Sequence, residues 1–126
     1  MTRHAAVTAE TDWISFARWK YPLKWLGNLA MVGGVVGIFP VNSGGYHGMT
    51  GYVDNIERMI KAVGVDHVGI GTDMDGISPP SFVAYDDYAE WPSVTGALLA
   101  RGYSRDDVAK VAGGNFLRVF DEVIAT

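Results

Sequence analysis

Apolar residues recur along the chain in stretches with two different periods. From Thr11, and again after Pro22, they repeat at helical spacing, and a proline suits the first turn of the second helix. Residues 33–40, GGVVGIFP, form a short β-branched run bounded by glycine and proline, as in a strand buried on both faces. The pattern therefore predicts two helical pieces followed by a strand.

A helix and a second strand follow the loop at residues 41–49. Thr50 can cap a helix whose apolar positions repeat every three or four residues as far as Val63, and Gly64 can end it. The next run, HVGIGTDMDG at residues 67–76, begins as a strand. Strand, helix and strand within about 40 residues are typical of a right-handed βαβ crossover with parallel strands.

The 67–76 stretch carries the first indication of chemistry. Gly69 and Gly71 alternate with β-branched residues, so a bulky group can approach the backbone closely on the glycine side. Asp73 stands at the carboxyl end of this strand. In parallel sheets that end is where ligands and catalytic groups collect, which makes Asp73 a candidate site residue.

The carboxyl-terminal part of the chain predicts three helices. Val94–Arg101 forms a short helix that Gly102 closes, and Ser104 begins a capping-box-like start for the next. The last helix is expected to start at Gly114 or Asn115. Its apolar positions share one face: Leu117, Phe120 and Val123.

These elements predict one partial α/β domain in three parts. Residues 1–32 are a helical lead-in, residues 33–76 a strand-helix-strand unit, and residues 77–126 a packed loop with the carboxyl-terminal helices. Two parallel strands are too few to close a sheet or to pair both of its edges. We therefore expect the chain to be part of a larger α/β unit, or to assemble with copies of itself.

Composition narrows the function classes. The 126 residues are 48% hydrophobic, carry a net charge of -4 and include no cysteine, which is typical of one soluble domain. Without cysteine, a metal needs His, Asp or Glu ligands. Scattered Lys and Arg on an acidic chain argue against nucleic acid as a partner. No apolar run reaches membrane-spanning length and the amino end lacks a signal-peptide core, so we expect a cytoplasmic location.

Asp73 and Asp75 have two interpretations. A strand-end carboxylate can move protons or anchor a substrate amine. Alternatively, the sequence DMDG is a turn whose carboxylates cap backbone amides, as Asp and Gly often do. A calcium loop has less support, because the third oxygen ligand and the later glutamate of an EF-hand are absent from the sequence.

Other candidate sites have weak support from spacing. His4, His47 and His67 are not within helical or strand reach of one another, so spacing alone assembles no metal site. The glycine runs lack the spacing of a dinucleotide-binding loop and are not followed by the Lys-Ser or Lys-Thr pair of a phosphate-binding loop.

Three segments of the chain are GGVVGIFP, YVDNIERMIKAVGVDHVGIGTDMDGI and TGALLARGYSRDDVAKVAGGNFLRVF. In this order and at these separations, they resemble the carboxyl-terminal part of the membrane dipeptidase (renal dipeptidase) family of zinc peptidases. The resemblance runs from about Gly33 to Val123, and the strand with TDMDG is its most specific part. It implies the carboxyl-terminal portion of a (β/α)8 TIM-type barrel, namely the last two strands and flanking helices, incomplete on its own.

The resemblance also assigns site residues. Asp73 falls on the family's active-site aspartate, which contacts the metal-bridging water and the substrate's amino group. His4 and Arg18 lie where the last zinc-binding histidine and the arginine that grips the substrate carboxylate fall in the family. The family's remaining zinc ligands, including its bridging glutamate, have no counterpart in this chain.

Together these features predict a fragment or truncated form of a zinc-dependent metallopeptidase that hydrolyses dipeptides and is inactive alone. On the resemblance, the complete enzyme binds two zinc ions and a dipeptide substrate, whereas we expect this chain alone to bind no zinc. The alternative is a non-catalytic α/β module that self-assembles, or pairs with another subunit, through its open strand edges. The expected protein partners are therefore copies of the chain or the missing portion of the barrel.

Overall fold

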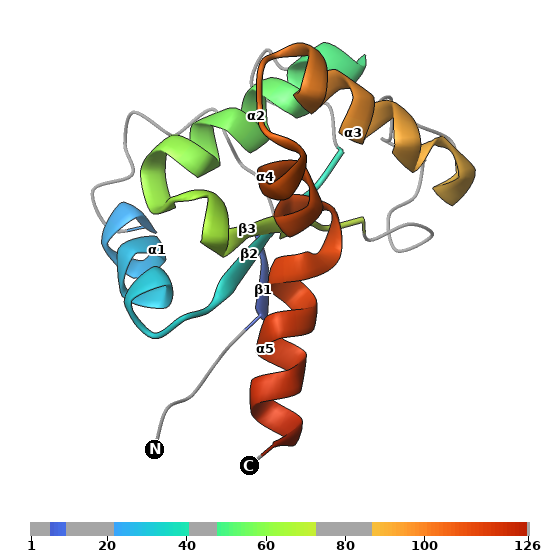
Figure 1. Cartoon of the computed structure of the whole chain (residues 1–126). Coiled ribbons are helices and arrows are strands. Elements are labelled where there is room, and N and C mark those ends of the chain that lie inside the picture. The colour runs from blue at the N-terminus through green and yellow to red at the C-terminus, as the bar shows by residue number, and fades with distance from the viewer. Residues whose placement is uncertain (1–5, 10–21, 41–47, 73–86, 126) are drawn as a thin grey trace.

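The computed structural model describes residues 6–9, 22–40, 48–72 and 87–125 (Figure 1). Its elements alternate between strands and helices as far as β3 and are helical from there on. In chain order they are β1 (Ala6–Ala9), α1 (Pro22–Met31), β2 (Val35–Ile38), α2 (Gly48–Val63), η2 (Val65–His67), β3 (Val68–Ile70), η3 (Tyr88–Glu90), α3 (Trp91–Ala100), α4 (Arg105–Ala109), η4 (Lys110–Gly114) and α5 (Asn115–Ile124).

The described strands form one parallel sheet in the order β1-β2-β3. In the pairing of β2 with β3, Val36 lies opposite Val68 and Ile38 opposite Ile70. The long connection through α2 allows this parallel arrangement, which a short hairpin turn cannot give. The predicted α/β strand-helix-strand unit is therefore confirmed, although β3 ends at Ile70 and is shorter than expected.

Strand β1 corrects the expectation that residues 1–32 form a helical lead-in to two strands. Its four residues, AVTA, pair with β2 from Ala6 opposite Val35 to Ala9 opposite Ile38. So short a segment with alanine at both ends has little intrinsic strand preference, and its hydrogen bonds come from a strand more than 25 residues away along the chain. The second predicted helix is confirmed as α1, which begins at Pro22; the first lies outside the described residues.

Helices α2, α3 and α4 pack with the sheet around one hydrophobic core. Helix α2 contributes residues at the predicted spacing of three or four positions, and Figure 1 shows it crossing the upper part of the molecule beside α3. Burying each large apolar side chain stabilises the fold by about 1.5–3 kcal/mol. The buried members of the core are Val36, Ile38, Tyr52, Val53, Ile56, Met59, Val68, Val94, Leu98, Val108 and Val111.

The boundary between α3 and α4 follows its local sequence. Gly102 follows α3 with a φ of 94°, a conformation that glycine adopts without strain. The Ser104 hydroxyl accepts a hydrogen bond of 3.1 Å from the amide of Asp107, as an N-cap does. The predicted helix end and the predicted capped start are therefore both confirmed.

The prediction that a new helix starts at Gly114 or Asn115 is confirmed, because α5 begins at Asn115 and Gly114 directly precedes it. The segment η4 between α4 and α5 contains a kink, because Gly113 has the non-helical angles φ 165° and ψ -19°, and no side chain caps the start of α5. A Cβ atom at Gly114 would lie 3.0 Å from the carbonyl oxygen of Ala109. Gly114 therefore permits a close backbone approach beside the kink where α5 begins.

Within the described residues, no helix combines the length and the apolar character needed to cross a lipid bilayer.

Candidate functional site

The carboxyl ends of the parallel strands define the candidate site. Because β1, β2 and β3 run in the same direction, the chain leaves all three strands at the same edge of the sheet. In α/β folds this edge is where loops bring catalytic and binding groups together. In the sequence, Asp73, the main candidate, directly follows Thr72, the last described residue after β3.

Two hydrogen bonds fix the ends of β2 and β3 at this edge. The carbonyl oxygen of Ile38 accepts a hydrogen bond of 2.9 Å from the hydroxyl of Tyr52, a buried residue of α2. It accepts a second hydrogen bond of 3.0 Å from the backbone amide of Gly71. Tyr52 is buried, so its hydrogen bond is costly to lose, whereas Gly71 is partly exposed. The backbone just before residue 73 is therefore held to both β2 and α2.

Glycines allow β2 and β3 to approach closely near this edge. A Cβ atom at Gly37 would lie 3.2 Å from the Cα atom of Gly71, and one at Gly69 would lie 3.1 Å from the Val35 Cγ1 atom. Both distances are tighter than ordinary van der Waals contact. The predicted close approach on the glycine side is confirmed, and the groups that approach are β2 backbone and side-chain atoms.

The residues assigned from the resemblance lie outside the described part of the chain. These are Asp73, proposed as catalytic and substrate-binding, Arg18, proposed to bind substrate, and His4, proposed as a metal ligand. Asp75 and His47 also lie outside it. Their assignments stay predictions.

His67 lies at the opposite end of the strands from the candidate site. Its Nδ1 atom is 2.9 Å from the carbonyl oxygen of Gly34, which precedes β2. Because a carbonyl oxygen can only accept, this contact requires a proton on Nδ1. His67 therefore joins the amino ends of β2 and β3, in keeping with the expectation that it stands at the wrong end of its strand for a catalytic role.

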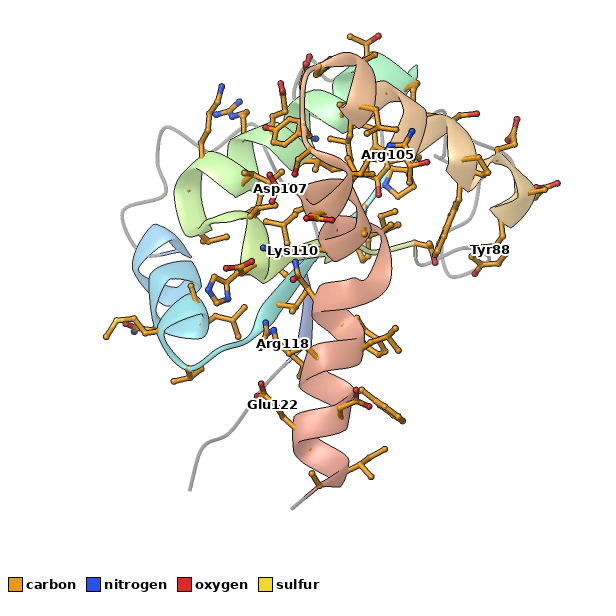
Figure 2. The ribbon with its side chains drawn as sticks, in the orientation of Figure 1. Tyr88, Arg105, Asp107, Lys110, Arg118 and Glu122 are labelled. Atoms are coloured by element: carbon orange, nitrogen blue, oxygen red, sulfur yellow. The ribbon has the colours of Figure 1, made fainter. Side chains whose placement is uncertain are left out.

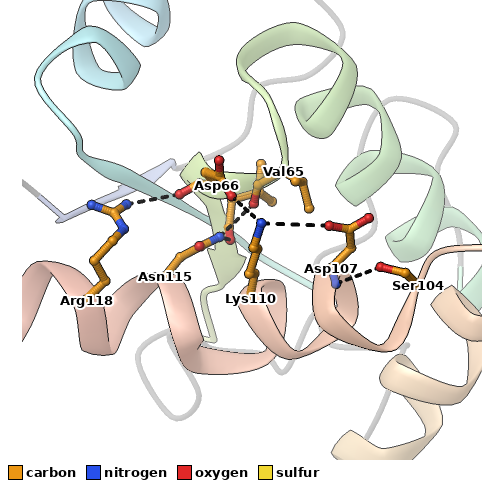
Figure 3. A network of polar contacts seen from close by, with 8 residues as sticks. Val65, Asp66, Ser104, Asp107, Lys110, Asn115 and Arg118 are labelled. Atoms are coloured by element: carbon orange, nitrogen blue, oxygen red, sulfur yellow. Dashed lines mark hydrogen bonds and ion pairs between the residues drawn. The ribbon is translucent and has the colours of Figure 1, made fainter.

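A network of polar contacts ties α5 to these same amino ends (Figure 3). The side-chain amide of Asn115, which is 3% exposed, donates hydrogen bonds of 2.7 Å to the carbonyl of Val65 and 2.8 Å to that of Val68. Arg118 donates hydrogen bonds of 2.9 Å to the carbonyl of Gly33 and 3.0 Å to that of Asp66. The first two turns of α5 therefore anchor the segments that lead into β2 and β3.

An ion pair at the surface extends this network. Lys110 Nζ lies 2.7 Å from Asp66 Oδ1 and 3.9 Å from Asp107 Oδ1 (Figure 3). The hydrogen bond from Lys110 lowers the pKa of the Asp66 carboxyl below its ordinary value, and the same bond raises the pKa of Lys110. Exposed pairs of this kind contribute little to stability. We therefore assign the network to holding the fold and not to chemistry.

A second ionic cluster joins α2 to α3. Arg101 Nη1 lies 2.5 Å from Asp54 Oδ1 and 2.6 Å from Glu57 Oε2, while its other terminal nitrogen donates a 3.3 Å hydrogen bond to the carbonyl of Thr50. The hydrogen bond to Asp54 is the main cause that raises the pKa of the guanidinium. Burial raises the pKa of the adjacent Tyr103, and the charge of Glu57 adds to this effect.

Zinc has no matching set of ligands in the described ranges. No group of three or more His, Asp or Glu side chains there is arranged to hold a metal ion. The one histidine in these ranges, His67, directs Nδ1 to the Gly34 carbonyl. The described residues therefore do not fit the dizinc site that the resemblance implies.

Sequence reasoning did not identify Asn115, Arg118 or Arg101 as anchors. Asn115 was considered only as the start of a helix, yet it lies one turn before Val119, which is buried. A polar residue on the buried side of an amphipathic helix requires a hydrogen-bond partner, and this signal was available in the sequence. The partners themselves lie 47 to 50 residues away, beyond the reach of any local pattern.

Comparisons with known proteins agree with this arrangement. The dipeptidase tcpJ of Claviceps purpurea (strain 20.1) is 38% identical over 71 residues, which are 56% of this chain and 16% of that protein. The crystal structure of the probable dipeptidase PvdM from Pseudomonas aeruginosa superposes with a TM-score of 0.54 at 44% identity, over 61% of this chain and 19% of that one. An amidohydrolase from Pseudomonas aeruginosa superposes with a TM-score of 0.71 over 96% of this chain and 45% of that one, and at 23% identity this likeness concerns the fold alone.

The chain thus spans only a minor part of the length of these relatives. The sequence profile of the membrane dipeptidase family (peptidase family M19) nevertheless matches residues 23–126. This match begins one residue after the start of α1 and includes β2, α2, β3 and all the carboxyl-terminal helices. By this match over most of its length, the chain belongs to the membrane dipeptidase family.

Proposed function

We propose that this chain supplies the carboxyl-terminal share of a membrane-dipeptidase-like metallopeptidase, and that it hydrolyses dipeptides only within a completed barrel. The observation that carries the proposal is the parallel pairing of β2 with β3, which brings the carboxyl ends of both strands to one edge of the sheet; in the sequence, Asp73 follows the end of β3 by three residues. That is the edge where parallel α/β enzymes place their catalytic groups. The family match over residues 23–126 supports the same assignment.

In this proposal Asp73 accepts or relays a proton and orients the amino end of a dipeptide. A carboxylate in this position contributes about 10²–10⁴-fold to turnover when it acts as a general acid or base. The hydrogen bonds from Tyr52 and Gly71 to Ile38 support this role, because they fix the backbone two residues before Asp73. Zinc enters as a property of the complete enzyme, since the described residues offer no ligand set for it.

A chimera tests the proposal directly. Residues 23–126 of this chain would replace the matching segment of the Claviceps purpurea dipeptidase, and hydrolysis of L-alanyl-L-alanine would be measured beside the unmodified host. We expect turnover that Asp73→Asn lowers by about 10²-fold or more while the melting temperature stays unchanged. The matched Asp75→Asn variant should stay within a few-fold of the parent chimera, because its carboxylate is expected to cap the turn.

The outcomes distinguish the two functions predicted from the sequence, a dipeptide-hydrolysing metallopeptidase and a non-catalytic α/β module. A folded chimera without hydrolase activity would favour the non-catalytic α/β module. Equal losses of turnover in the two aspartate variants, with the fold intact, would remove the special role given to Asp73.

A further inference from the structure

The side chain of Tyr52 carries a hydroxyl into the hydrophobic core, where packing alone does not require one. The residue is 3% exposed and belongs to the core cluster. A phenylalanine ring would fill the same space without a polar oxygen, which costs free energy to bury unless it finds a partner. The Tyr52 hydroxyl donates its 2.9 Å hydrogen bond to the carbonyl oxygen of Ile38, the last residue of β2. This bond is what distinguishes Tyr52 from a core phenylalanine.

The Ile38 carbonyl joins three segments at the carboxyl ends of the strands. Besides the Tyr52 hydroxyl, it binds the amide of Gly71, the residue directly after β3, at 3.0 Å. A Cβ atom at Gly37 would lie 3.2 Å from the Gly71 Cα atom, so the two chain segments are in close contact at this point. One carbonyl therefore links α2, β2 and the chain that leaves β3.

Helix α2 gives the Tyr52 hydroxyl a firm support. Val53, Ile56 and Met59 lie on the same helix, are fully buried and belong to the hydrophobic core. A movement of α2 relative to the sheet would open this packing and expose apolar surface to water. The end of β2 is therefore tied to an element that the core holds in place.

The amino ends of β2 and β3 are held by other side chains. Asn115 and Arg118 of α5 donate two hydrogen bonds each to backbone carbonyls there. Arg118 Nη1 also lies 3.6 Å from Glu122 Oε1, and Figure 2 shows these two side chains together on one side of α5. Loss of the Tyr52 hydroxyl leaves all these contacts in place. It should therefore loosen the carboxyl ends of the strands locally, without unfolding the sheet.

We propose that Tyr52 is a positioning residue for the candidate site. Its hydroxyl acts through the Ile38 carbonyl to fix the backbone of Gly71, which precedes Asp73 by two residues in the sequence. The inference rests on the proposed function for the reaction that this positioning serves, whereas the hydrogen bonds belong to this chain. A displacement of about 1 Å in a reacting group can lower turnover about 10²-fold. Because the hydroxyl is buried against backbone, its loss should lower kcat and leave KM unchanged.

Amide hydrogen exchange of the full chain, followed by NMR, tests the positioning without an activity measurement. Tyr52→Phe removes the hydroxyl and keeps the ring. We expect the Gly71 amide to exchange about threefold to tenfold faster, as the net contribution of one hydrogen bond implies, while the His67 amide before β3 changes by less than about twofold. Tyr103→Phe is the matched control, because the Tyr103 hydroxyl bonds to Glu57 and should leave both amides unaffected.

The Claviceps purpurea chimera extends the test to the reaction. Tyr52→Phe should lower kcat about tenfold and leave KM within about twofold, because positioning is disturbed and substrate contacts are not. Tyr103→Phe should leave both constants within about twofold of the parent chimera. The pH profile of kcat should keep its shape in Tyr52→Phe, because this hydroxyl transfers no proton to substrate.

Several results would overturn the proposal. One is an unchanged Gly71 exchange rate in Tyr52→Phe, and another is an equal increase at His67, which would indicate general loss of structure. Effects of the same size in Tyr103→Phe, or an active chimera whose kcat Tyr52→Phe leaves unchanged, would also overturn it. An inactive parent chimera counts against the proposed function alone, and the exchange rates then decide whether Tyr52 holds this edge of the sheet.

Discussion

Replacing Asn115 should weaken the fold without touching the candidate site. Its side-chain amide donates to two carbonyls, at 2.7 Å to Val65 and 2.8 Å to Val68, from a site that is 3% exposed. Asn115→Ala removes both donors. The Val68 bond is fully buried, so that carbonyl loses its partner where water cannot replace it.

The size of the effect follows from the buried acceptors. An unsatisfied buried polar group costs about 1–3 kcal/mol. With one fully buried and one partly buried carbonyl, Asn115→Ala should lower the free energy of unfolding by about 2–4 kcal/mol. With a urea dependence of about 2 kcal/mol per molar, the middle of the usual range, the midpoint should fall by about 1–2 M. The matched Asn28→Ala variant, at an exposed position of α1, should stay within about 0.5 kcal/mol of the parent.

Urea titrations followed by far-ultraviolet circular dichroism measure both variants under the same conditions. If Asn115→Ala lowers the free energy of unfolding by less than 1 kcal/mol, or by no more than Asn28→Ala does, the anchoring role assigned to Asn115 is wrong. An unchanged urea dependence would show that both variants unfold from a state of similar compactness.

Three further predictions concern charges, pH and metal. Arg101→Met should lower the free energy of unfolding by only about 0.5–1 kcal/mol in urea titrations, and less at high salt, because its partners are partly exposed. Lys110 lowers the pKa of Asp66 in the folded state, so the pair stabilises the fold above the ordinary carboxyl pKa, and this contribution is lost as the pH falls through the folded-state pKa. The difference in urea midpoint between the parent and Lys110→Met should therefore shrink as the pH is lowered from neutral into the acid range, and a difference that does not shrink contradicts this assignment. The purified chain should retain far less than one zinc ion by mass spectrometry and should not hydrolyse a simple dipeptide; chelator-sensitive activity would refute this.

Sequence patterns predicted the elements whose signals are local. Helix α2 follows from its repeat of apolar positions, and the cap at Ser104 follows from the residue itself. Strand β1 could not be predicted in this way, because its stability comes from pairing with β2.

The last helix shows a further limit of periodicity. Leu117, Phe120 and Val123 were predicted to share a face, yet all three are more than half exposed, while Asn115 and Val119 are buried. A repeat identifies residues that lie on one side of a helix, but what that side packs against depends on distant segments.

The candidate site was predicted in outline only. The parallel pairing of β2 and β3 brings the carboxyl end of β3, at Ile70, to the edge expected for a site. Asp73, Arg18 and His4 were assigned by resemblance, and all three lie outside the described residues, so their roles rest on the experiments above.

The anchoring of α5 also sets the order in which the chain can fold as it is synthesised. Arg118 binds the carbonyl of Gly33 across 85 positions of sequence, and Asn115 binds Val68 across 47. A ribosome releases residues in order, so the carbonyls beside β2 and β3 emerge well before the side chains of Asn115 and Arg118 that donate hydrogen bonds to them. Until α5 emerges, water or a chaperone must satisfy those carbonyls. A chain truncated before residue 115 would therefore contain the sequences of all three strands but lack the Asn115 and Arg118 side chains that bind the segments before β2 and β3.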